Sequence, residues 1–572
     1  MITTPVLYRA PRLSTTRAFA RMVTSTTVQT RYLSNTPVNH EAAPAAAPAH
    51  HEKRGGLKAI DDILARRAKA GKLVAGIAAA SNSDMFKGST EGMPSAKRWD
   101  DHLTRESRAR GPCTLKQAAK HLKQPGIISL GGGLPSSQVF PFASLSMKVP
   151  TVPNFHEADT LTNGQTLSIG KYDVRDEVAD YDLSIALNYG QSTGSAQMMR
   201  FLTEHTEIIC QPPYKDWGVC QTVGSTGALE QALRMFCDKD RNDSVLTEDF
   251  SFSTALETIH PLGVHVFGAA IDDQGLLPEA MDEMLTNWDT SARDGARKPH
   301  VLYTVPSGQN PTGATQSAER RRAIYAVAQK HDLFIIEDEP YYFLQMKAYP
   351  SDAQAAAAPS PPESVQDFVD SLLPTLVSLD TDGRVLRMDS FSKVLVPGSR
   401  LGWIVASAQI VERFQRHAEV ANQGPNGFSQ VILHKLLDET WGHEGYLKWL
   451  MNLRLEYTAK RNTLLAACEE HLPRGLVSWT PPVAGMFMWF TVDHAQHPDA
   501  GKRDLKAIEE EIFDSCIQNG VLIARGSWFQ TEKEKPLSGL HFRATYASAS
   551  AESMSEAISR FAAAVRKSFR KA

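Results

Sequence analysis

Short apolar runs without polar alternation constrain the fold of this chain more than any other feature of its sequence. They occupy residues 301–305, 333–336, 385–388 and 401–405, and amphipathic helical stretches separate them. A strand that is apolar on both faces is buried on both faces, which is typical of a parallel sheet covered by helices. The pattern therefore predicts an α/β domain of about 250 residues, with a mainly parallel sheet, in the middle of the chain.

The length of the chain, 572 residues, predicts more than one domain. We expect an N-terminal arm with part of a smaller domain over 57–190, a large domain over 191–410, and a small α+β domain over 411–572. An Ala/Pro-rich stretch interrupts the large domain. Because long structureless loops are uncommon inside compact domains, we interpret residues 347–384 as a surface insertion, with a short helix at 365–373.

The N-terminal residues differ in composition from the rest of the chain. They include five arginines and many Ser and Thr residues, and no acidic residue precedes Glu41. Such a leader is typical of a mitochondrial transit peptide, with cleavage expected after Leu33; a disordered basic tail is the alternative. We expect residues 1–33 to be the transit peptide and 34–56 a low-complexity linker. The predicted location is the mitochondrial matrix, with the cytoplasm as second choice.

The overall composition excludes several classes of partner. A net charge of −3 gives no electrostatic reason to expect nucleic acid or an anionic membrane. No apolar run reaches the roughly 18 residues that a membrane-spanning helix needs. The six cysteines are scattered without a C-x-x-C pair, so neither a disulfide framework nor a metal site is expected. These numbers describe an ordinary globular protein of enzyme size.

The segment DSFSK at 389–393, with an arginine seven residues after its lysine, carries the strongest chemical signal. It follows an apolar run, so Lys393 is expected at the carboxyl edge of the sheet, where open α/β sheets bind ligands. The hydroxyls of Ser390 and Ser392 and the guanidinium of Arg400 can all donate to a phosphate. A surface lysine in a serine-rich turn is the alternative.

Two further segments place polar side chains directly after apolar runs. In IIEDEPYY (335–342), Asp338 precedes Tyr341 by three residues, and PSGQNPTG (306–313) contains Asn310. An acidic turn at a strand end would explain the first segment, and ordinary loop formers would explain the second. Their order and their spacing of about 28 residues are harder to attribute to loops.

A small-residue helix start and an aromatic side chain follow the same logic. In TVGSTGAL (222–229), the residues Ser225, Thr226 and Gly227 would let backbone N–H groups approach a phosphate at a helix N-terminus. Phe252 could offer the face of its ring to a planar ligand. A phenylalanine in the hydrophobic core is the alternative for Phe252.

Three more residues concern a substrate and the entrance to the site. Arg543 in LHFRATY (540–546) could fork onto a carboxylate, although a structural ion pair is the alternative. Gly133 belongs to a glycine-rich segment at 128–135. Tyr189 precedes a turn glycine, where an ordinary half-buried tyrosine is equally expected.

In their order, and over roughly residues 108–566, these segments resemble the fold-type-I pyridoxal-5'-phosphate (PLP) aminotransferases of class I/II. The resemblance is greatest to the fungal aromatic amino acid, kynurenine and 2-aminoadipate aminotransferases. It implies an α/β large domain, whose mainly parallel sheet is flanked by helices, and a smaller α+β domain. It also implies PLP as cofactor and a homodimer in which Tyr189 reaches the neighbouring subunit's phosphate.

The resemblance assigns a role to each of these residues. It implies that Lys393 holds PLP and transfers protons, that Asp338 keeps the ring nitrogen protonated, and that Tyr341 contacts the ring's 3-oxygen. The other cofactor contacts are Asn310 at the 3-oxygen, Phe252 on the ring face, and Ser225, Thr226, Gly227, Ser390, Ser392, Arg400 and Tyr189 at the phosphate. The substrate contacts are Arg543, Gly133 and Asn310.

The implied activity is a ping-pong transamination between an aromatic or related amino acid and a 2-oxo acid such as 2-oxoglutarate. Leu115 and Lys116 stand where some relatives place an arginine for a second substrate carboxylate, so the preference between aromatic and dicarboxylic substrates stays open. One rival is a PLP lyase, decarboxylase or synthase on the same scaffold. Another is a non-catalytic regulator, although residues 57–107 are short for its DNA-binding domain.

Overall fold

The structure is a computed structural model that describes residues 56–118, 126, 128, 130–131, 133–349 and 363–571. Residues 53–572 form one compact unit. The predicted transit peptide (1–33), and all of the predicted linker except Gly56, lie outside the described residues. Both therefore stay predictions.

A seven-stranded sheet forms the centre of the large domain. Four of its neighbouring pairs are parallel, and β11 is antiparallel to both of its neighbours. Every residue is buried in all of these strands except β5, which confirms the expectation of a mainly parallel sheet covered on both faces. In spatial order the strands are β3 (Trp217–Thr222), β11 (Gly402–Ser407), β10 (Val385–Ser390), β9 (Phe334–Asp338), β8 (Val301–Thr304), β4 (Ser244–Glu248) and β5 (His265–Ala269).

Helices pack on this sheet through their apolar faces. In α6 (Ala196–Ile209), Ser195 caps the N-terminus by accepting from the Met198 N–H, and nearly every side chain of the helix is buried. The others that contact the sheet or one another are α7 (Gly224–Phe236), α8 (Ser253–Ile259), α9 (Pro278–Thr286), α10 (Ala318–Lys330) and α14 (Ala408–Ala421). Shorter elements are α2 (Arg105–Ala109), α3 (Thr114–Ala118), α5 (Leu183–Ala186), α15 (Gly427–His434), β6 (Ile271–Asp272) and β7 (Gly275–Leu276).

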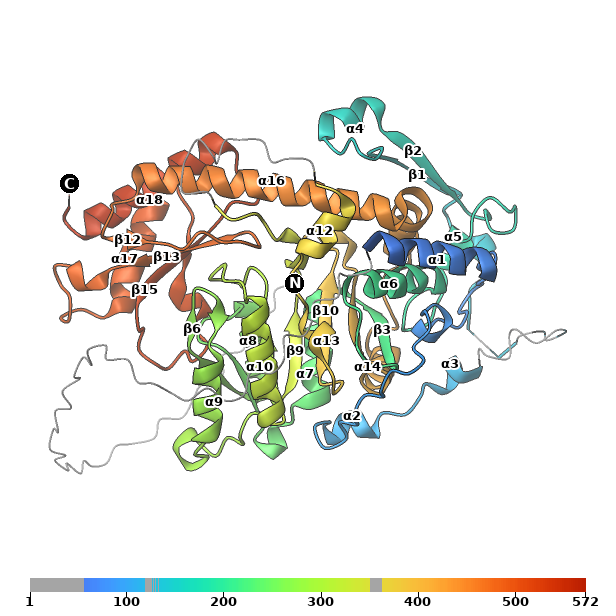
Figure 1. The fold of residues 1–572 in the computed structure, drawn as a ribbon, viewed down its shortest axis with the longest axis horizontal. Helices are drawn as coiled ribbons and strands as arrows, with labels where there is room; N and C mark the ends of the chain where they lie inside the picture. The colour runs from blue at the N-terminus through green and yellow to red at the C-terminus, as the bar shows by residue number, and fades with distance from the viewer. Residues whose placement is uncertain are drawn as a thin grey trace, which may run out of the picture. The chain divides into compact units, whose positions relative to one another are not determined.

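A second, antiparallel sheet lies in the C-terminal part of the chain, drawn in orange and red in Figure 1. Its order is β12-β13-β15-β14, and Trp489 on β13 pairs with Arg543 on β15. Helix α18 packs against α16 and α17, and α17 and α18 contact the sheet. The bounds are β12 (Val477–Ser478), β13 (Phe487–Val492), β14 (Ala524–Arg525), β15 (Leu540–Thr545), α16 (Gly442–His471), α17 (Leu505–Gln518) and α18 (Ala551–Ser568).

Two N-terminal features complete the unit. Helix α1 (Gly56–Ala70) packs against α6, and its Arg67 pairs with Glu204 of α6 and, at 2.6 Å, with Asp438. A hairpin of β1 (Ser144–Val149) and β2 (Gln165–Gly170), with α4 (Glu157–Asn163) between its strands, is shown at the upper right of Figure 1.

The structure contains a helix where one was predicted, at 365–373 within the expected surface insertion over 347–384. Helix α12 (Val365–Ser371) starts with a capping box at Ser364 and buries Phe368 and Val369, and it contacts α1 and α16. Helix α13 (Leu376–Leu379) is also partly buried. The sequence predicted this helix but not the burial of its apolar side chains against α1 and α16. Residues 350–362 lie outside the described residues.

Within the described ranges, no helix combines the length and apolarity that crossing a membrane requires. The same residues hold no cluster of three His, Cys, Asp or Glu side chains that could bind a metal ion.

Candidate active site

Residues from several strand ends meet at one edge of the central sheet. Asp338 is the last residue of β9, Ser390 is the last of β10, and Lys393 follows three residues later. Ligands of open α/β sheets bind at this carboxyl edge. A cavity of about 260 Å³ lies here, lined by Ser225, Thr226, Leu229, Phe252, Thr254, Val305, Asn310, Asp338, Pro340, Tyr341, Ser390, Ser392, Lys393, Pro397, Arg400 and Phe487.

Lys393 presents a half-buried amine to this cavity. Burial lowers its pKa, and the positive charges of Arg400 and Arg543 lower that pKa further. A lower pKa increases the fraction of the neutral amine, which is the form that attacks a carbonyl carbon or accepts a proton.

One end of the cavity is built to hold an oxyanion. Ser390 Oγ donates to Ser392 Oγ at 2.8 Å, and Arg400 donates to Ser392 Oγ at 3.2 Å. Gly224 begins α7 with a φ of +73°, and a Cβ on it would lie 2.3 Å from Arg400 Nη2, so glycine lets the guanidinium approach the helix start. Ser225 Oγ is buried and has no partner among the described residues. A helix N-terminus, hydroxyls and a guanidinium together suit a phosphate.

The carboxylate of Asp338 lies elsewhere in the cavity. One oxygen, Oδ2, accepts from the Tyr303 hydroxyl at 2.9 Å, while Oδ1 is buried without a partner in the described part of the chain. Burial raises the pKa of Asp338 to about 7. A cationic N–H placed against Oδ1 would favour the charged carboxylate. Tyr303 was missed in the sequence, because a tyrosine inside an apolar run has the appearance of a core residue.

Arg543 reaches toward the cavity from the small sheet. It donates to Asn310 Oδ1 at 2.7 Å, and its guanidinium carbon lies 4.3 Å from the ring centre of Phe487 and 4.6 Å from that of Phe529. Its Nε has no partner among the described residues. Tyr341 packs edge-on against Phe487. The planar guanidinium is held between two rings, which keeps its fork of donors in one orientation.

Sequence reasoning missed both phenylalanines around Arg543. Phe487 begins the apolar strand β13, and Phe529 ends a short helical turn, η11 (Gly526–Phe529). Neither carries a local signal that separates it from a core residue, because each acquires its neighbour only when β13, β15 and the turn come together. A search for aromatic residues near the expected carboxylate-binding arginine would have needed the fold.

Arg543 is not itself a lining residue of the cavity, and the remaining sequence-predicted residues also lie outside the lining in this single chain. Gly227 is in the first turn of α7 but is not among the lining residues. Gly133 is exposed, with no atom within 4 Å of the position its Cβ would take. Tyr189 is 60% exposed and lines a separate hollow. Lys116 donates to Ser192 Oγ at 2.6 Å and to the carbonyl of Gln423 at 3.1 Å.

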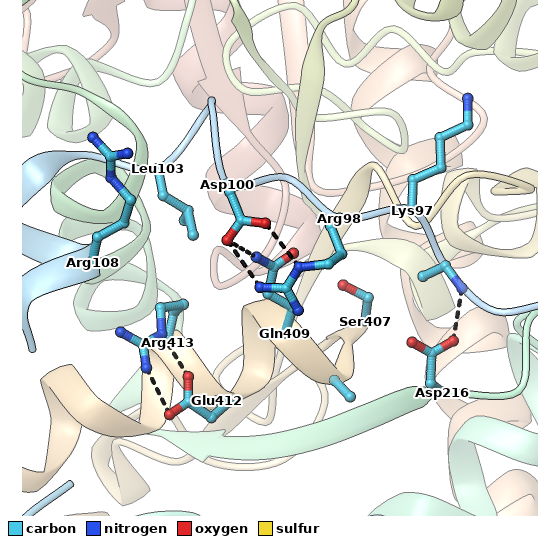
Figure 2. Close-up of a pocket in the computed structure, with 12 residues that line it drawn as sticks. Lys97, Arg98, Asp100, Leu103, Arg108, Asp216, Ser407, Gln409, Glu412 and Arg413 are labelled. Carbon is cyan, nitrogen blue, oxygen red and sulfur yellow. Dashed lines mark hydrogen bonds and ion pairs between the residues drawn. The ribbon is translucent and has the colours of Figure 1, made fainter. Parts of the chain in front are cut away.

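A second cavity, of about 620 Å³, shares no lining residue with the first. Figure 2 shows that its charged groups mostly pair with one another: Arg98 donates to Asp100, and Arg413 donates to Glu412. Asp216 accepts from a backbone N–H at 2.7 Å. This second cavity has no group comparable to the half-buried amine of Lys393. We therefore take the first cavity as the candidate active site.

The fold has solved relatives. Aminotransferase Aro8 of Candida albicans superposes with a TM-score of 0.77 at 40% identity, covering 83% of this chain and all of that one. The class of protein is thus a PLP-dependent enzyme of fold type I.

Residues 173–561 match the family model of aminotransferase class I and II, and the chain belongs to this family. An aromatic amino acid aminotransferase of Schizosaccharomyces pombe is 44% identical over 474 residues, covering 82% of this chain and 98% of the relative. The mitochondrial kynurenine/alpha-aminoadipate aminotransferase of Bos taurus is 31% identical over 478 residues, with coverages of 82% and 98%.

The cavity fits the family's cofactor, PLP, by four observations. An unpartnered buried oxygen of Asp338 suits the ring nitrogen, and the unpartnered hydroxyl of Ser225 suits a phosphate oxygen. The space above Gly224, which any side chain would fill, keeps Arg400 close to the helix start. A lysine amine with a lowered pKa completes the set.

Proposed function

We propose that this protein transfers the amino group of phenylalanine, tyrosine, tryptophan or a related amino acid, such as kynurenine or 2-aminoadipate, to a 2-oxo acid such as 2-oxoglutarate. The observation that carries the proposal is a lysine amine, with a lowered pKa, in one cavity with Asp338 and beside Arg543. The names of relatives support the substrate class, among them an L-tyrosine:2-oxoglutarate aminotransferase of Tapinella panuoides, 36% identical over 401 residues.

Bound PLP supplies a carbonyl carbon for the amine and a protonated ring that accepts electrons. In the proposed arrangement, Asp338 holds the ring nitrogen, Tyr341 and Asn310 donate to the 3-oxygen, and Phe252 covers one face of the ring. The phosphate would be held by Ser225, Thr226, Gly227, Ser390, Ser392 and Arg400.

Lys393 moves the proton in this proposal. Its neutral amine would remove the proton from the substrate Cα as general base, and the protonated amine would then return a proton as general acid. Burial, and after it the charges of two neighbouring guanidinium groups, lower the pKa of the amine, which increases its neutral fraction near neutral pH.

Arg543 orients the substrate in this proposal by a two-point contact with its α-carboxylate. Asn310 accepts from one end of the guanidinium, and the rings of Phe487 and Phe529 flank the rest. A fixed carboxylate places the substrate Cα within reach of the amine of Lys393.

The cavity lining supports aromatic substrates over dicarboxylic ones. Its apolar side chains include Leu229, Val305, Phe252 and Phe487. Among the described lining residues, the cations are Lys393 and Arg400, both of which have other roles in the proposal. A second substrate carboxylate would therefore lack a dedicated cation there, and we expect 2-aminoadipate to be the poorer substrate.

We also propose a homodimer with two-fold symmetry, in which Tyr189 of one subunit reaches the neighbouring subunit's phosphate. The exposure of this side chain leaves it free to do so. Light scattering on the purified protein tests the proposal, and a monomer with full activity would refute it.

We keep the matrix of mitochondria as the proposed location, on the composition of residues 1–33. These residues fused to a fluorescent protein should direct it to mitochondria. A diffuse cytoplasmic signal would instead favour the second choice.

A substrate panel tests the proposed activity. The purified protein, loaded with PLP, is given phenylalanine, tyrosine, tryptophan, kynurenine and 2-aminoadipate, with and without 2-oxoglutarate. The proposal expects the highest kcat/KM with an aromatic amino acid and no product without the 2-oxo acid. Product that forms without an amino acceptor would favour the lyase or decarboxylase alternative.

A further inference from the structure

The buried tyrosine that contacts Asp338 has no part in the function proposed above. Tyr303 lies on β8, with none of its surface exposed. Strand β8 runs parallel to β9, and Tyr303 pairs with Ile336, two residues before Asp338. This register directs its hydroxyl to Asp338 Oδ2, to which it donates at 2.9 Å.

The hydrogen bond divides the two oxygens of the carboxylate between two tasks. Oδ2 is held by the phenol, whereas Oδ1 is buried and has no partner among the described residues. The terminal torsion of an aspartate is broad, so without a partner the carboxylate could turn. The phenol therefore selects one orientation, in which Oδ1 stays available to the cavity.

The charges around Asp338 increase the importance of this donor. Burial and the nearby carboxylates of Asp389 and Glu248 raise the pKa of Asp338. The Tyr303 hydroxyl and the positive charge of Arg387 act in the opposite direction. A donor that favours the carboxylate also favours a cationic N–H against it.

We propose that Tyr303 is a positioning residue, which holds the Asp338 carboxylate so that Oδ1 meets the protonated ring nitrogen of PLP. The inference rests on the proposed function and deepens it, because it assigns part of the affinity for PLP to a side chain that touches neither cofactor nor substrate. If Tyr303 only filled space in the core, a phenylalanine would serve equally well.

A matched control lies elsewhere in the same domain. Tyr325, on α10, is 6% exposed and donates its hydroxyl to buried Asp380 at 3.0 Å. Neither Tyr325 nor Asp380 lines the cavity of Lys393. Tyr325→Phe therefore removes a buried tyrosine–aspartate hydrogen bond without disturbing the cofactor site.

The experiment titrates PLP into cofactor-free wild-type protein, Tyr303→Phe and Tyr325→Phe, and measures the Kd by equilibrium dialysis. Tyr303→Phe should raise the Kd about tenfold, since a hydrogen bond to a charged group is lost. Tyr325→Phe should leave the Kd within about twofold of wild type. Thermal unfolding of each cofactor-free protein measures the purely structural cost, which should be at least as large in Tyr325→Phe, because the Tyr325 hydroxyl also accepts from the N–H groups of Thr381 and Asp382.

Two further measurements separate positioning from packing. The pH at which the absorbance band of bound PLP changes should shift in Tyr303→Phe and not in Tyr325→Phe. In an Asp338→Asn background, adding Tyr303→Phe should raise the Kd by clearly less than it does in wild type, because the two residues act as a unit. Tyr303→His keeps a hydrogen-bond donor and should therefore bind PLP more tightly than Tyr303→Phe. The same variant replaces Tyr303→Phe in the experiment if the phenylalanine variant does not fold.

Wild-type protein that binds PLP, together with a Tyr303→Phe variant of equal affinity and unchanged pH dependence, would overturn this inference alone. Wild-type protein that does not bind PLP would overturn the proposed function together with it.

Discussion

Asp338 and Arg543 lie at the same cavity, but different parts of the fold hold them in place. The Asp338 carboxylate and its partner Tyr303 belong to neighbouring strands of one sheet and are almost fully buried. Arg543 comes from the second sheet and is half-buried, and it reaches Asn310 of the large domain through one hydrogen bond. In the proposed function, the contact with the ring nitrogen of the cofactor therefore depends on one sheet, whereas the contact with the substrate carboxylate depends on two.

Because of this difference, we expect mutations at the two places to have different effects. A change near Asp338 should alter PLP affinity and the pH at which the bound cofactor changes its absorbance. A change near Arg543 should leave cofactor binding unchanged and weaken the binding of the amino acid substrate. Mutations of Lys393, Arg543, Asp338 and Tyr189 test that division.

Replacing Lys393 should have the largest effect. Lys393→Ala removes the amine that is proposed to hold the cofactor and move the proton, so turnover should fall by about 10⁴-fold or more. Conversion of phenylalanine to its 2-oxo acid measures it, and Lys330→Ala, at an exposed lysine of α10, is the control. Unchanged turnover in Lys393→Ala would refute the proposed function.

Changes at Arg543 should come next and should act on the substrate. Arg543→Ala should lower kcat/KM for phenylalanine by about 10²-fold, since a charge-assisted two-point contact is lost. Arg543→Lys keeps the charge but not the planar fork, and it should recover only part of that loss. The Kd of PLP should change by less than about threefold in both variants; a large loss of PLP affinity would break the division between the two residues.

The pH dependence of stability should distinguish Asp338. Its pKa is raised to about 7 in the folded protein, above its ordinary value of 3.8. Between those values the folded state binds more protons than the unfolded state, so this group lowers the unfolding free energy as the pH rises through that window. Between pH 5 and pH 8, the unfolding free energy should fall because of this group by close to, but not more than, about 3 kcal/mol.

Urea unfolding of cofactor-free wild type and Asp338→Asn at both pH values measures this loss. The variant lacks the titration, so wild type should lose stability relative to it as the pH rises. Added PLP should reduce the difference. An equal pH dependence in the two proteins would show that Asp338 titrates in its ordinary range.

The smallest effect is expected at Tyr189. If this residue contacts the phosphate across a dimer, Tyr189→Phe should raise the Kd of PLP about three- to tenfold, the loss expected for one hydrogen bond. Tyr457→Phe on α16, outside the cavity lining, is the control. Unchanged affinity in a dimeric Tyr189→Phe protein would remove Tyr189 from the proposed site.

The strand ends were predictable from sequence because their signals are local. Buried strands have apolar runs, and the polar residues that follow them meet at one edge of a parallel sheet, as Asp338, Ser390 and Lys393 do. The helix start at Gly224 was predictable in the same way. The family resemblance singled out both Arg543 and Asn310, which the structure brings into contact, although the strand of Arg543 carries no chemical signal of its own.

Residues whose function depends on contacts across the fold could not be predicted. Tyr303 is one aromatic residue in an apolar strand, and only the register between β8 and β9 shows that it reaches Asp338. Phe529 gains its contact with Arg543 only when the small sheet is complete. The short helix inside the expected insertion over 347–384 was predicted at 365–373, but its packing against α1 and α16 was not, because that contact also forms only across the fold.

The absorbance spectrum of the purified, PLP-loaded protein tests the central claim most directly. Phenylalanine is added first and 2-oxoglutarate second, without any coupling enzyme. The account predicts that the band of the enzyme-bound cofactor fades with the amino acid and returns with the 2-oxo acid, as the two halves of a transamination require. A band that never forms, or one that fades and does not return with any 2-oxo acid, would contradict it.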